Sequence, residues 1–191
     1  LHLLSRRQRQ MCIRDSSISS LRNIKAKYHY PEVQAVFTSP LKRCTESADI
    51  MFPKNNPIVI NDFIEYNFGE FEECTAKDLE NNEDFIKWIR GDMNSRPPYG
   101  ESNAEFTHRV CDAFEKVVDG LIKTQTETAA IVGHAGVLMT ILACYGLPEA
   151  PMAHWQMDPG YGFKLRITPS LWMRANKLEV ADTAPETTRE E

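Results

Sequence analysis

Residues 129–139 constrain the fold of this chain more than any other stretch, because two apolar runs meet there in a Gly-His-Ala-Gly turn around His134. The first run, residues 129–132, has the length and composition of a buried β-strand. The second run, which continues to Tyr145, has helical spacing. His134 is therefore predicted at the carboxyl end of a strand and just before a helix, where open α/β sheets bind ligands and helix N–H groups attract anions. A histidine satisfied within a strand-to-helix turn would produce the same local pattern.

The rest of the chain continues this alternation of strands and helices. Apolar residues spaced for one helical face predict helices over residues 16–30, 39–51, 77–90 and 102–123. Short strands are predicted over residues 33–37 and 57–60, and strand and turn segments over residues 155–157, 161–168 and 171–180. This order predicts an α/β protein: a three-layer α/β/α sandwich around a mostly parallel sheet.

Two of these helices have recognisable starts. Ser102 and Glu105 stand in the Ser-x-x-Glu arrangement of a capping box. Ser39 is a good N-cap for the second helix, and Pro40 suits its first position because the N–H there would have no helical partner in any case. Both helices are therefore predicted to begin at these residues.

Charge, apolar content and cysteine spacing exclude several classes of protein. The 191 residues suffice for one domain, and the formal net charge of -5, without a long basic block, argues against a nucleic-acid partner. No run approaches the roughly 18–20 apolar residues of a membrane span, and we see no secretory signal. The five cysteines are scattered without a Cys-x-x-Cys pair, as expected of reduced thiols. We expect a cytoplasmic protein.

The first residues of the chain do not look like part of a fold. Residues 1–15 show no apolar periodicity, and residues 6–15 resemble the translation of a transposase mosaic-end sequencing adapter. We interpret residues 1–15 as such an artefact, with the true start of the gene cut off, and expect the domain to span residues 16–180. The acidic residues 181–191 are expected to form a disordered tail.

Two charged residues fall where predicted strands give way to other elements. Arg43 lies in the first turn of a helix that follows a strand, where a guanidinium can pair with a phosphate or carboxylate. Glu65 lies among aromatic residues, which would raise the pKa of its carboxyl and suit it to general-acid chemistry. A surface arginine and a solvated acidic loop are the alternatives. The acids that compete with Glu65 are Glu70, Glu72 and Glu73.

Four motifs, taken in their order, resemble the histidine phosphatase superfamily, whose fold is phosphoglycerate mutase-like. They are Ser-Pro-Leu-Lys-Arg at 39–43, Ile-Glu-Tyr-Asn-Phe-Gly-Glu-Phe-Glu at 64–72, Gly-Glu-Ser at 100–102 and Val-Gly-His-Ala-Gly-Val at 132–137. The resemblance covers residues 16–180. It is closest to the small phosphatase branch, which includes α-ribazole phosphatases and broad phosphomonoesterases, and less close to the longer mutases.

The resemblance implies an enzyme that hydrolyses a small-molecule phosphomonoester through a phosphohistidine intermediate. By this resemblance Arg43 would bind the transferring phosphoryl group, and Glu65 would donate the proton to the leaving alcohol. His134 would stabilise the phosphoryl charge, with the N–H of Ala135 as a further donor. No cofactor and no metal is implied, and a homodimer is left open.

One motif of that family is absent. The family's nucleophile is a histidine in Arg-His-Gly at the end of the first strand, and this sequence contains no Arg-His-Gly. We therefore expect a domain that lacks its first strand, a gap in the sheet, and negligible phosphatase activity from the chain as it stands. The alternatives are a phosphoglycerate mutase-type phosphosugar isomerase and a non-catalytic protein that binds a phosphate ligand.

Overall fold

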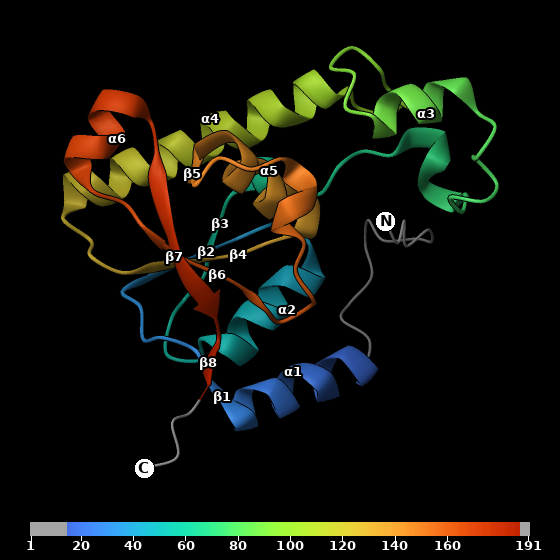
Figure 1. The fold of residues 1–191 in the computed structure, drawn as a ribbon. Helices are drawn as coiled ribbons and strands as arrows, with labels where there is room; N and C mark the ends of the chain where they lie inside the picture. Colours follow the sequence, from blue (N-terminus) through green and yellow to red (C-terminus); the bar gives the residue numbers. More distant parts are fainter. Residues whose placement is uncertain (1–14, 188–191) are drawn as a thin grey trace.

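The computed structural model describes residues 15–187, and its centre is a parallel sheet (Figure 1). The strands lie in the order β3 (Ile58–Val59), β2 (Ala35–Thr38) and β4 (Ala129–Val132), with β2 paired in parallel to both neighbours. Thr38, the last residue of β2, lies opposite Val132, the last residue of β4. Both strands therefore end at the same edge of the sheet, where the residues that follow them meet.

Helices cover both faces of this sheet (Figure 1). α1 (Asp15–Lys27) and α2 (Lys42–Met51) lie on one side, and α4 (Asn103–Thr124) and α5 (Ala135–Tyr145) lie on the other. The predicted three-layer sandwich with a mostly parallel sheet is thereby confirmed. The capping box is confirmed as well: the Ser102 hydroxyl accepts from the N–H of Glu105, whose carboxylate accepts from the N–H of Ser102.

The remaining strands form separate sheets. In one of these sheets the strand order is β5 (Gly146–Leu147), β7 (Leu178–Ala184), β6 (Gly162–Arg166). In the other, β1 (Tyr28–His29) pairs with β8 (Glu186–Thr187). Among residues 15–187, β4 pairs along one edge only, with β2, and β6 pairs along one edge only, with β7. Among the described residues, β4 and β6 are therefore edge strands of two separate sheets.

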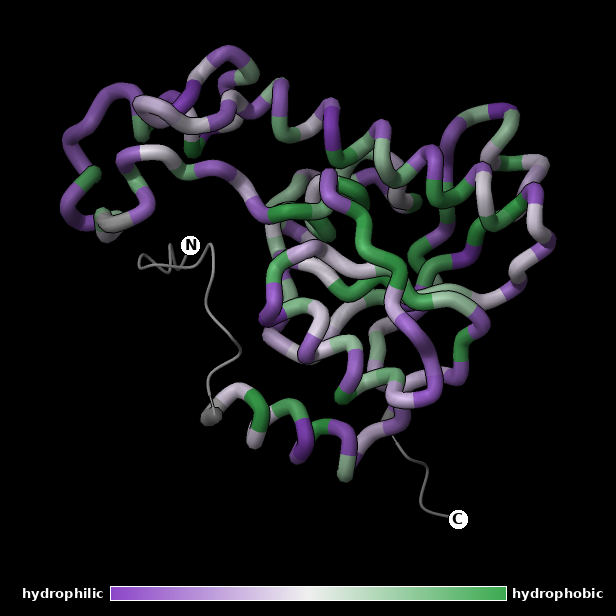
Figure 2. Tube along the Cα trace, turned by 180° about the vertical axis from the view of Figure 1, so that it is seen from behind, coloured by the Kyte–Doolittle hydropathy of each residue, from purple (hydrophilic) through white to green (hydrophobic). Residues whose placement is uncertain are grey.

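The hydrophobic core has a large and a small part. The small part lies between α2 and the parallel sheet, and its members are Val36, Ala48, Phe52 and Val132. The large part surrounds the fully buried Val110 and Val137, where α4 packs against α5. Hydrophobic residues accordingly follow the central strands in Figure 2. Burial of these apolar faces on both sides holds the strand ends in place.

A lobe of irregular chain leaves the sheet after β3. It contains the short turns η1 (Asn61–Phe63) and η2 (Gly69–Glu73) and the helix α3 (Glu83–Ile89), and it projects beyond the start of α4 (Figure 1). Its aromatic side chains pack together, with Tyr66 and Trp88 edge to face, and the indole of Trp88 donates to the hydroxyl of Tyr66 at 2.7 Å. This packing fixes the segment that carries Glu65.

Several sequence predictions need correction. The expected disordered tail begins inside β7, which continues to Ala184 because residues 179–184 pair with β6. Residues 188–191 and the adapter-like residues 1–14 lie outside the described part, whereas Asp15 is the first residue of α1. Residues 171–175, which lie in the segment predicted as strand and turn, belong to the helix α6 (Pro169–Ala175), which buries Trp172. Within residues 15–187, no helix is both long and apolar enough to cross a bilayer.

Two helices begin later than predicted. α3 begins at Glu83 rather than Lys77 because the Asn82 side chain caps it, accepting from the N–H of Phe85. α2 begins at Lys42 rather than just after Ser39, with Leu41 in the capping position. The Ser39 hydroxyl instead accepts from the N–H of Leu41 in a turn, at 3.3 Å. That turn leaves the hydroxyl facing His134.

Candidate active site

His134 lies where the sequence predicts it, directly after β4 and directly before α5. Its side chain is buried, with 6% of the residue exposed. One ring nitrogen, Nε2, is 2.7 Å from the Ser39 hydroxyl at the end of β2, and the other, Nδ1, is 3.0 Å from the Arg43 guanidinium. The register of β2 and β4 thus brings together residues that are about ninety positions apart in the chain.

These contacts assign the protonation state of His134. A guanidinium only donates hydrogen bonds, so Nδ1 is the acceptor and Nε2 carries the proton that is donated to Ser39. Burial, together with the charges of Arg43 and Arg109, lowers the pKa of His134 to about 3. His134 is therefore neutral at physiological pH while the site holds no anion.

Cys44 closes the site behind His134. Its Sγ lies 3.5 Å from Nε2 of the ring, and the residue is buried on α2. Burial raises the pKa of this thiol to about 11, so it is uncharged near neutral pH. Cys44 is consequently a poor nucleophile and serves as apolar packing.

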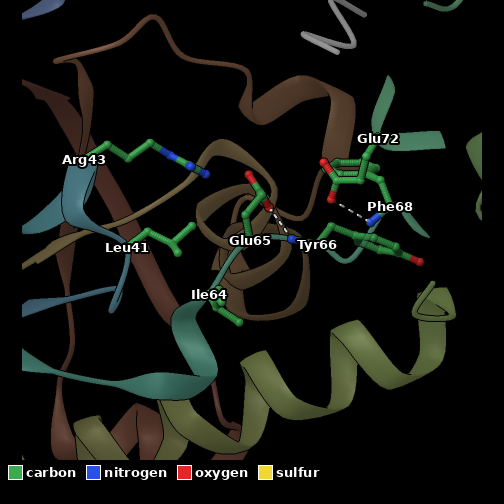
Figure 3. Close-up of a pocket in the computed structure, with 7 residues that line it drawn as sticks. All are labelled: Leu41, Arg43, Ile64, Glu65, Tyr66, Phe68 and Glu72. Atoms are coloured by element: carbon green, nitrogen blue, oxygen red, sulfur yellow. Dashed lines mark hydrogen bonds between the residues drawn. The ribbon is translucent and has the colours of Figure 1, made fainter. Parts of the chain in front are cut away.

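Glu65 faces Arg43 across a small, partly open pocket (Figure 3). Its Oε1 accepts from the N–H of Tyr66 at 2.9 Å, and its carboxylate also accepts from the N–H of Gly136 in the first turn of α5. Burial nevertheless dominates and raises the pKa of the carboxyl. A carboxyl whose pKa is raised holds its proton to a higher pH, and this is the property that a general acid requires.

The three site residues predicted from sequence therefore come together. Arg43 and Glu65 line one pocket, and Arg43 contacts His134. Ala135 begins α5 next to them and is exposed. Of the competing acids, Glu72 also lines the pocket, where its Oε1 accepts from the N–H of Phe68, and Glu70 is exposed.

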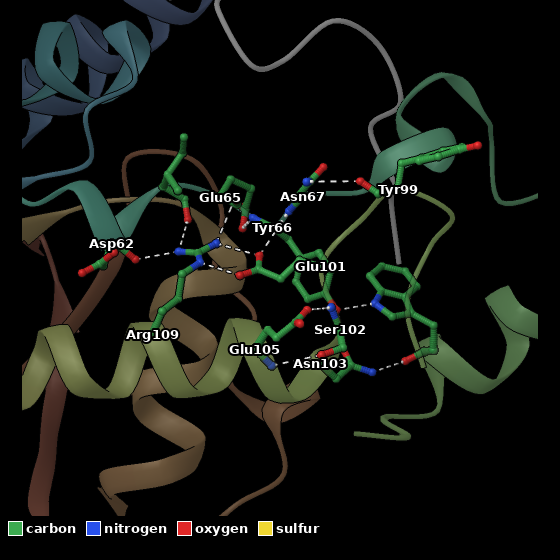
Figure 4. A network of polar contacts seen from close by, with 12 residues as sticks. Asp62, Glu65, Tyr66, Asn67, Tyr99, Glu101, Ser102, Asn103, Glu105 and Arg109 are labelled. Atoms are coloured by element: carbon green, nitrogen blue, oxygen red, sulfur yellow. Dashed lines mark hydrogen bonds and ion pairs between the residues drawn. The ribbon is translucent and has the colours of Figure 1, made fainter. Parts of the chain in front are cut away.

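Two residues that were not predicted as functional from the sequence, Gly136 and Arg109, hold Glu65 in place. A Cβ on Gly136 would lie 2.6 Å from Glu65 Oε1, so only glycine admits the carboxyl at the start of α5. Arg109 on α4 donates hydrogen bonds to the backbone carbonyls of Asp62, Ile64 and Glu65 (Figure 4). The spacing of polar residues on α4 gave no signal that would separate Arg109 from an ordinary solvent-facing arginine.

Arg109 is in turn fixed by the Gly-Glu-Ser motif. The guanidinium donates to both carboxylate oxygens of Glu101, at 2.6 and 2.9 Å, and Glu101 also accepts from the N–H of Asn67 at 3.4 Å (Figure 4). The motif therefore does more than cap α4, which was its structural interpretation from sequence. No group of three His, Cys, Asp or Glu side chains gathers into a metal-binding arrangement between residues 15 and 187.

Comparisons with known proteins agree with this geometry. The profile of the histidine phosphatase superfamily (branch 1) matches residues 10–174. An α-ribazole phosphatase from Shigella flexneri superposes with a TM-score of 0.75 at 18% identity, over 96% of this chain and 90% of that one. A phosphoglycerate mutase from Thermus thermophilus superposes with a TM-score of 0.57 at 21% identity, over 81% of each chain. No protein in a search of curated proteins matches the sequence.

The parallel sheet, its flanking helices and the polar residues at its carboxyl edge define an α/β protein of phosphoglycerate mutase-like fold. The family profile matches most of the chain and identifies the family: the chain belongs to the histidine phosphatase superfamily.

Proposed function

We propose that this protein belongs to the phosphatase side of its superfamily and that its site binds the phosphoryl group of a small phosphomonoester. The observation that carries the proposal is the convergence of Arg43, His134 and Glu65 at the carboxyl edge of the sheet. A guanidinium, a buried imidazole and a carboxyl of raised pKa are groups suited to binding the anion and protonating the leaving group in phosphate-ester cleavage. An α-ribazole phosphate is our candidate substrate, since an α-ribazole phosphatase is among the structures with this fold.

In the proposed mechanism, the anion displaces Arg43 from His134. The guanidinium then donates to the phosphoryl oxygens rather than to Nδ1. With the anion beside it, the pKa of His134 rises, and the imidazole takes up a proton and donates to the phosphoryl group. The N–H of Ala135, at the start of α5, is a further donor, and Glu65 protonates the departing alcohol oxygen.

Arg43, His134 and Glu65 do not supply the nucleophile that attacks the phosphorus atom. The sequence has no Arg-His-Gly, and Ser39 cannot substitute because His134 donates to its hydroxyl and so cannot remove its proton. Cys44 is uncharged and buried. We therefore propose that the 191-residue chain binds phosphate but turns over phosphomonoesters negligibly.

Titration with inorganic phosphate and an assay with para-nitrophenyl phosphate test both parts. Binding should be measurable by calorimetry and lost in Arg43→Ala, and no product should appear above the buffer rate. Robust turnover that His134→Ala abolishes would overturn the claim that a nucleophile is missing. Absence of phosphate binding by a folded chain would overturn the phosphoryl site itself.

The missing motif favours one alternative, a non-catalytic protein that binds a phosphate ligand. The two proposals differ in what an added nucleophile would do. A designed variant with a strand ending in Arg-His-Gly placed along the open edge of β4 should cleave para-nitrophenyl phosphate if Glu65 is a competent acid. Binding without any gain of turnover in that variant would favour the binding protein, and transfer of the phosphoryl group to a second sugar hydroxyl would favour a mutase.

A further inference from the structure

Two cysteines outside the proposed active site lie against each other between α4 and α5. Cys111 is on α4 and Cys144 is near the end of α5, and their side chains are hydrogen-bonded to each other. Both are free thiols and half-buried, at the margin of the large core. The pair joins residues that are far apart in the sequence, so its formation depends on the packing of the two helices.

The groups around the pair make the two thiols unequal. Cys111 also lies against Tyr145, whose hydroxyl donates its one proton to Glu115 at 2.8 Å. Lys177 donates to the backbone carbonyl of Cys144 at 3.1 Å and places its ammonium beside that thiol. Lys177 is itself paired with Glu149 at 2.8 Å. Positive charge and a thiol donor therefore face Cys144, while Tyr145 and the acidic Glu115 face Cys111.

We propose that Cys111 and Cys144 form a peroxide-reactive dithiol, a modification site that closes into a disulfide between α4 and α5. Cys144 attacks one peroxide oxygen and becomes a sulfenic acid while hydroxide, which takes up a proton, leaves as water. The sulfur of Cys111 then attacks the Cys144 sulfur, the S–O bond breaks, and a second water leaves with the proton of Cys111. The peroxide gains two electrons, and the two thiols lose them.

The electrostatics agree with this division of roles. The hydrogen bond from Cys111 and the charge of Lys177 lower the pKa of Cys144, and the same hydrogen bond raises the pKa of Cys111. Cys144 therefore loses its proton at a lower pH than Cys111 does, as the attacking thiol requires. Cys44, the buried thiol behind His134, has the opposite character, with a raised pKa.

Peroxide treatment of the folded chain, followed by mass spectrometry, tests the proposal without reference to phosphatase activity. Cys12→Ser serves as the common background, so that the cysteine outside the described residues does not contribute. The intact mass should fall by two hydrogen atoms, and peptide mapping should find Cys111 joined to Cys144. Neither Cys111→Ser nor Cys144→Ser should lose these hydrogens, whereas Cys74→Ser, which removes another half-buried thiol, should behave like the background.

Alkylation rates give an independent measurement. At pH 7, iodoacetamide should modify Cys144 on the order of ten-fold faster in the background protein than in Cys111→Ser, which lacks the thiol donor. Cys74→Ser, the matched control, should leave the rate at Cys144 unchanged. Equal rates at Cys144 with and without Cys111, or oxidation that leaves both cysteines of the pair as free thiols, would overturn the proposal.

Discussion

The guanidinium of Arg109 donates two hydrogen bonds to the carboxylate of Glu101, at 2.6 and 2.9 Å. The same guanidinium donates to three backbone carbonyls of the segment that ends in Glu65. A single side chain on α4 thus joins the Gly-Glu-Ser motif to the general-acid segment. Because backbone carbonyls in irregular chain need donors, this arginine replaces the hydrogen bonds that a strand or helix would otherwise provide.

Arg109→Gln should therefore destabilise the fold. The ion pair is mostly buried, with side-chain exposures of 21% and 13%, so its loss leaves the Glu101 carboxylate and several backbone carbonyls without their hydrogen-bond donor. We expect the free energy of unfolding to fall by about 2–3 kcal/mol, less than for a fully buried pair. Arg96→Gln breaks the exposed pair with Glu105, at 54% and 52% exposure, and should cost no more than about 0.5 kcal/mol. Urea denaturation compares the two variants. Equal losses of unfolding free energy would contradict a structural role for the Arg109–Glu101 pair.

Gly136→Ala should displace Glu65 rather than unfold the protein. The new Cβ would lie 2.6 Å from the tip of a flexible side chain, which can rotate away into solvent. Since burial is the largest cause of the raised pKa of Glu65, that pKa should fall toward the ordinary value of about 4.3. Carbon-13 NMR titration of the carboxyl measures this. Gly120→Ala on α4, where a Cβ meets nothing within 4 Å, is the control and should leave the Glu65 pKa unchanged. An unaltered Glu65 pKa in Gly136→Ala would contradict the close contact.

Acid should destabilise the wild type through His134. The folded pKa, about 3, lies below the unfolded value of about 6.5, so the unfolded state binds the proton more readily between these values. The contribution of His134 is therefore complete above about pH 6.5, is lost as the pH falls toward 3, and amounts to roughly 3–5 kcal/mol. Glu65 acts in the opposite direction, because a raised carboxyl pKa favours the folded state in acid.

Comparison with His134→Gln separates these contributions. The variant should lose less stability on acidification than the wild type, as followed by urea denaturation at a series of pH values. His108→Gln is the control, because His108 is exposed on α4, with 79% of its side chain accessible. If the free energy of unfolding changes with pH in the same way in His134→Gln and in the wild type, the assignment of His134 as a buried neutral histidine is wrong.

Arg43→Lys should weaken phosphate binding while keeping the charge. A guanidinium binds phosphate oxygens with two parallel donors, and an ammonium acts as a point charge. The loss of one charge-assisted hydrogen bond corresponds to about a ten-fold higher Kd for inorganic phosphate, which calorimetry measures. Lys42→Ala removes the neighbouring exposed cation, whose pair with Glu46 spans 3.6 Å, and should change the Kd little. Equal weakening by both variants would indicate general electrostatic attraction rather than a built site.

Much of the site's framework could be predicted because its signals are local. The apolar run before His134, the helical spacing after it and the capping box of Ser102 and Glu105 each involve residues within a few positions of one another. Propensity, periodicity and capping act over that range, so the sequence alone placed His134 at the end of a strand and Arg43 in the first turn of a helix.

Tertiary structure decided the features that depend on pairing between distant segments. The acidic residues after Ala181 lack strand periodicity, yet they continue β7 because β6 offers them a ladder of hydrogen bonds. Arg109 and Gly136 look ordinary in the sequence, and their roles arise only where α4 and α5 meet the Glu65 segment. The sequence by itself determined the alternation of the central strands and helices and the positions of His134 and Arg43 within it. Packing decided which of those residues touch, because long-range contacts carry no local periodicity that a sequence can display.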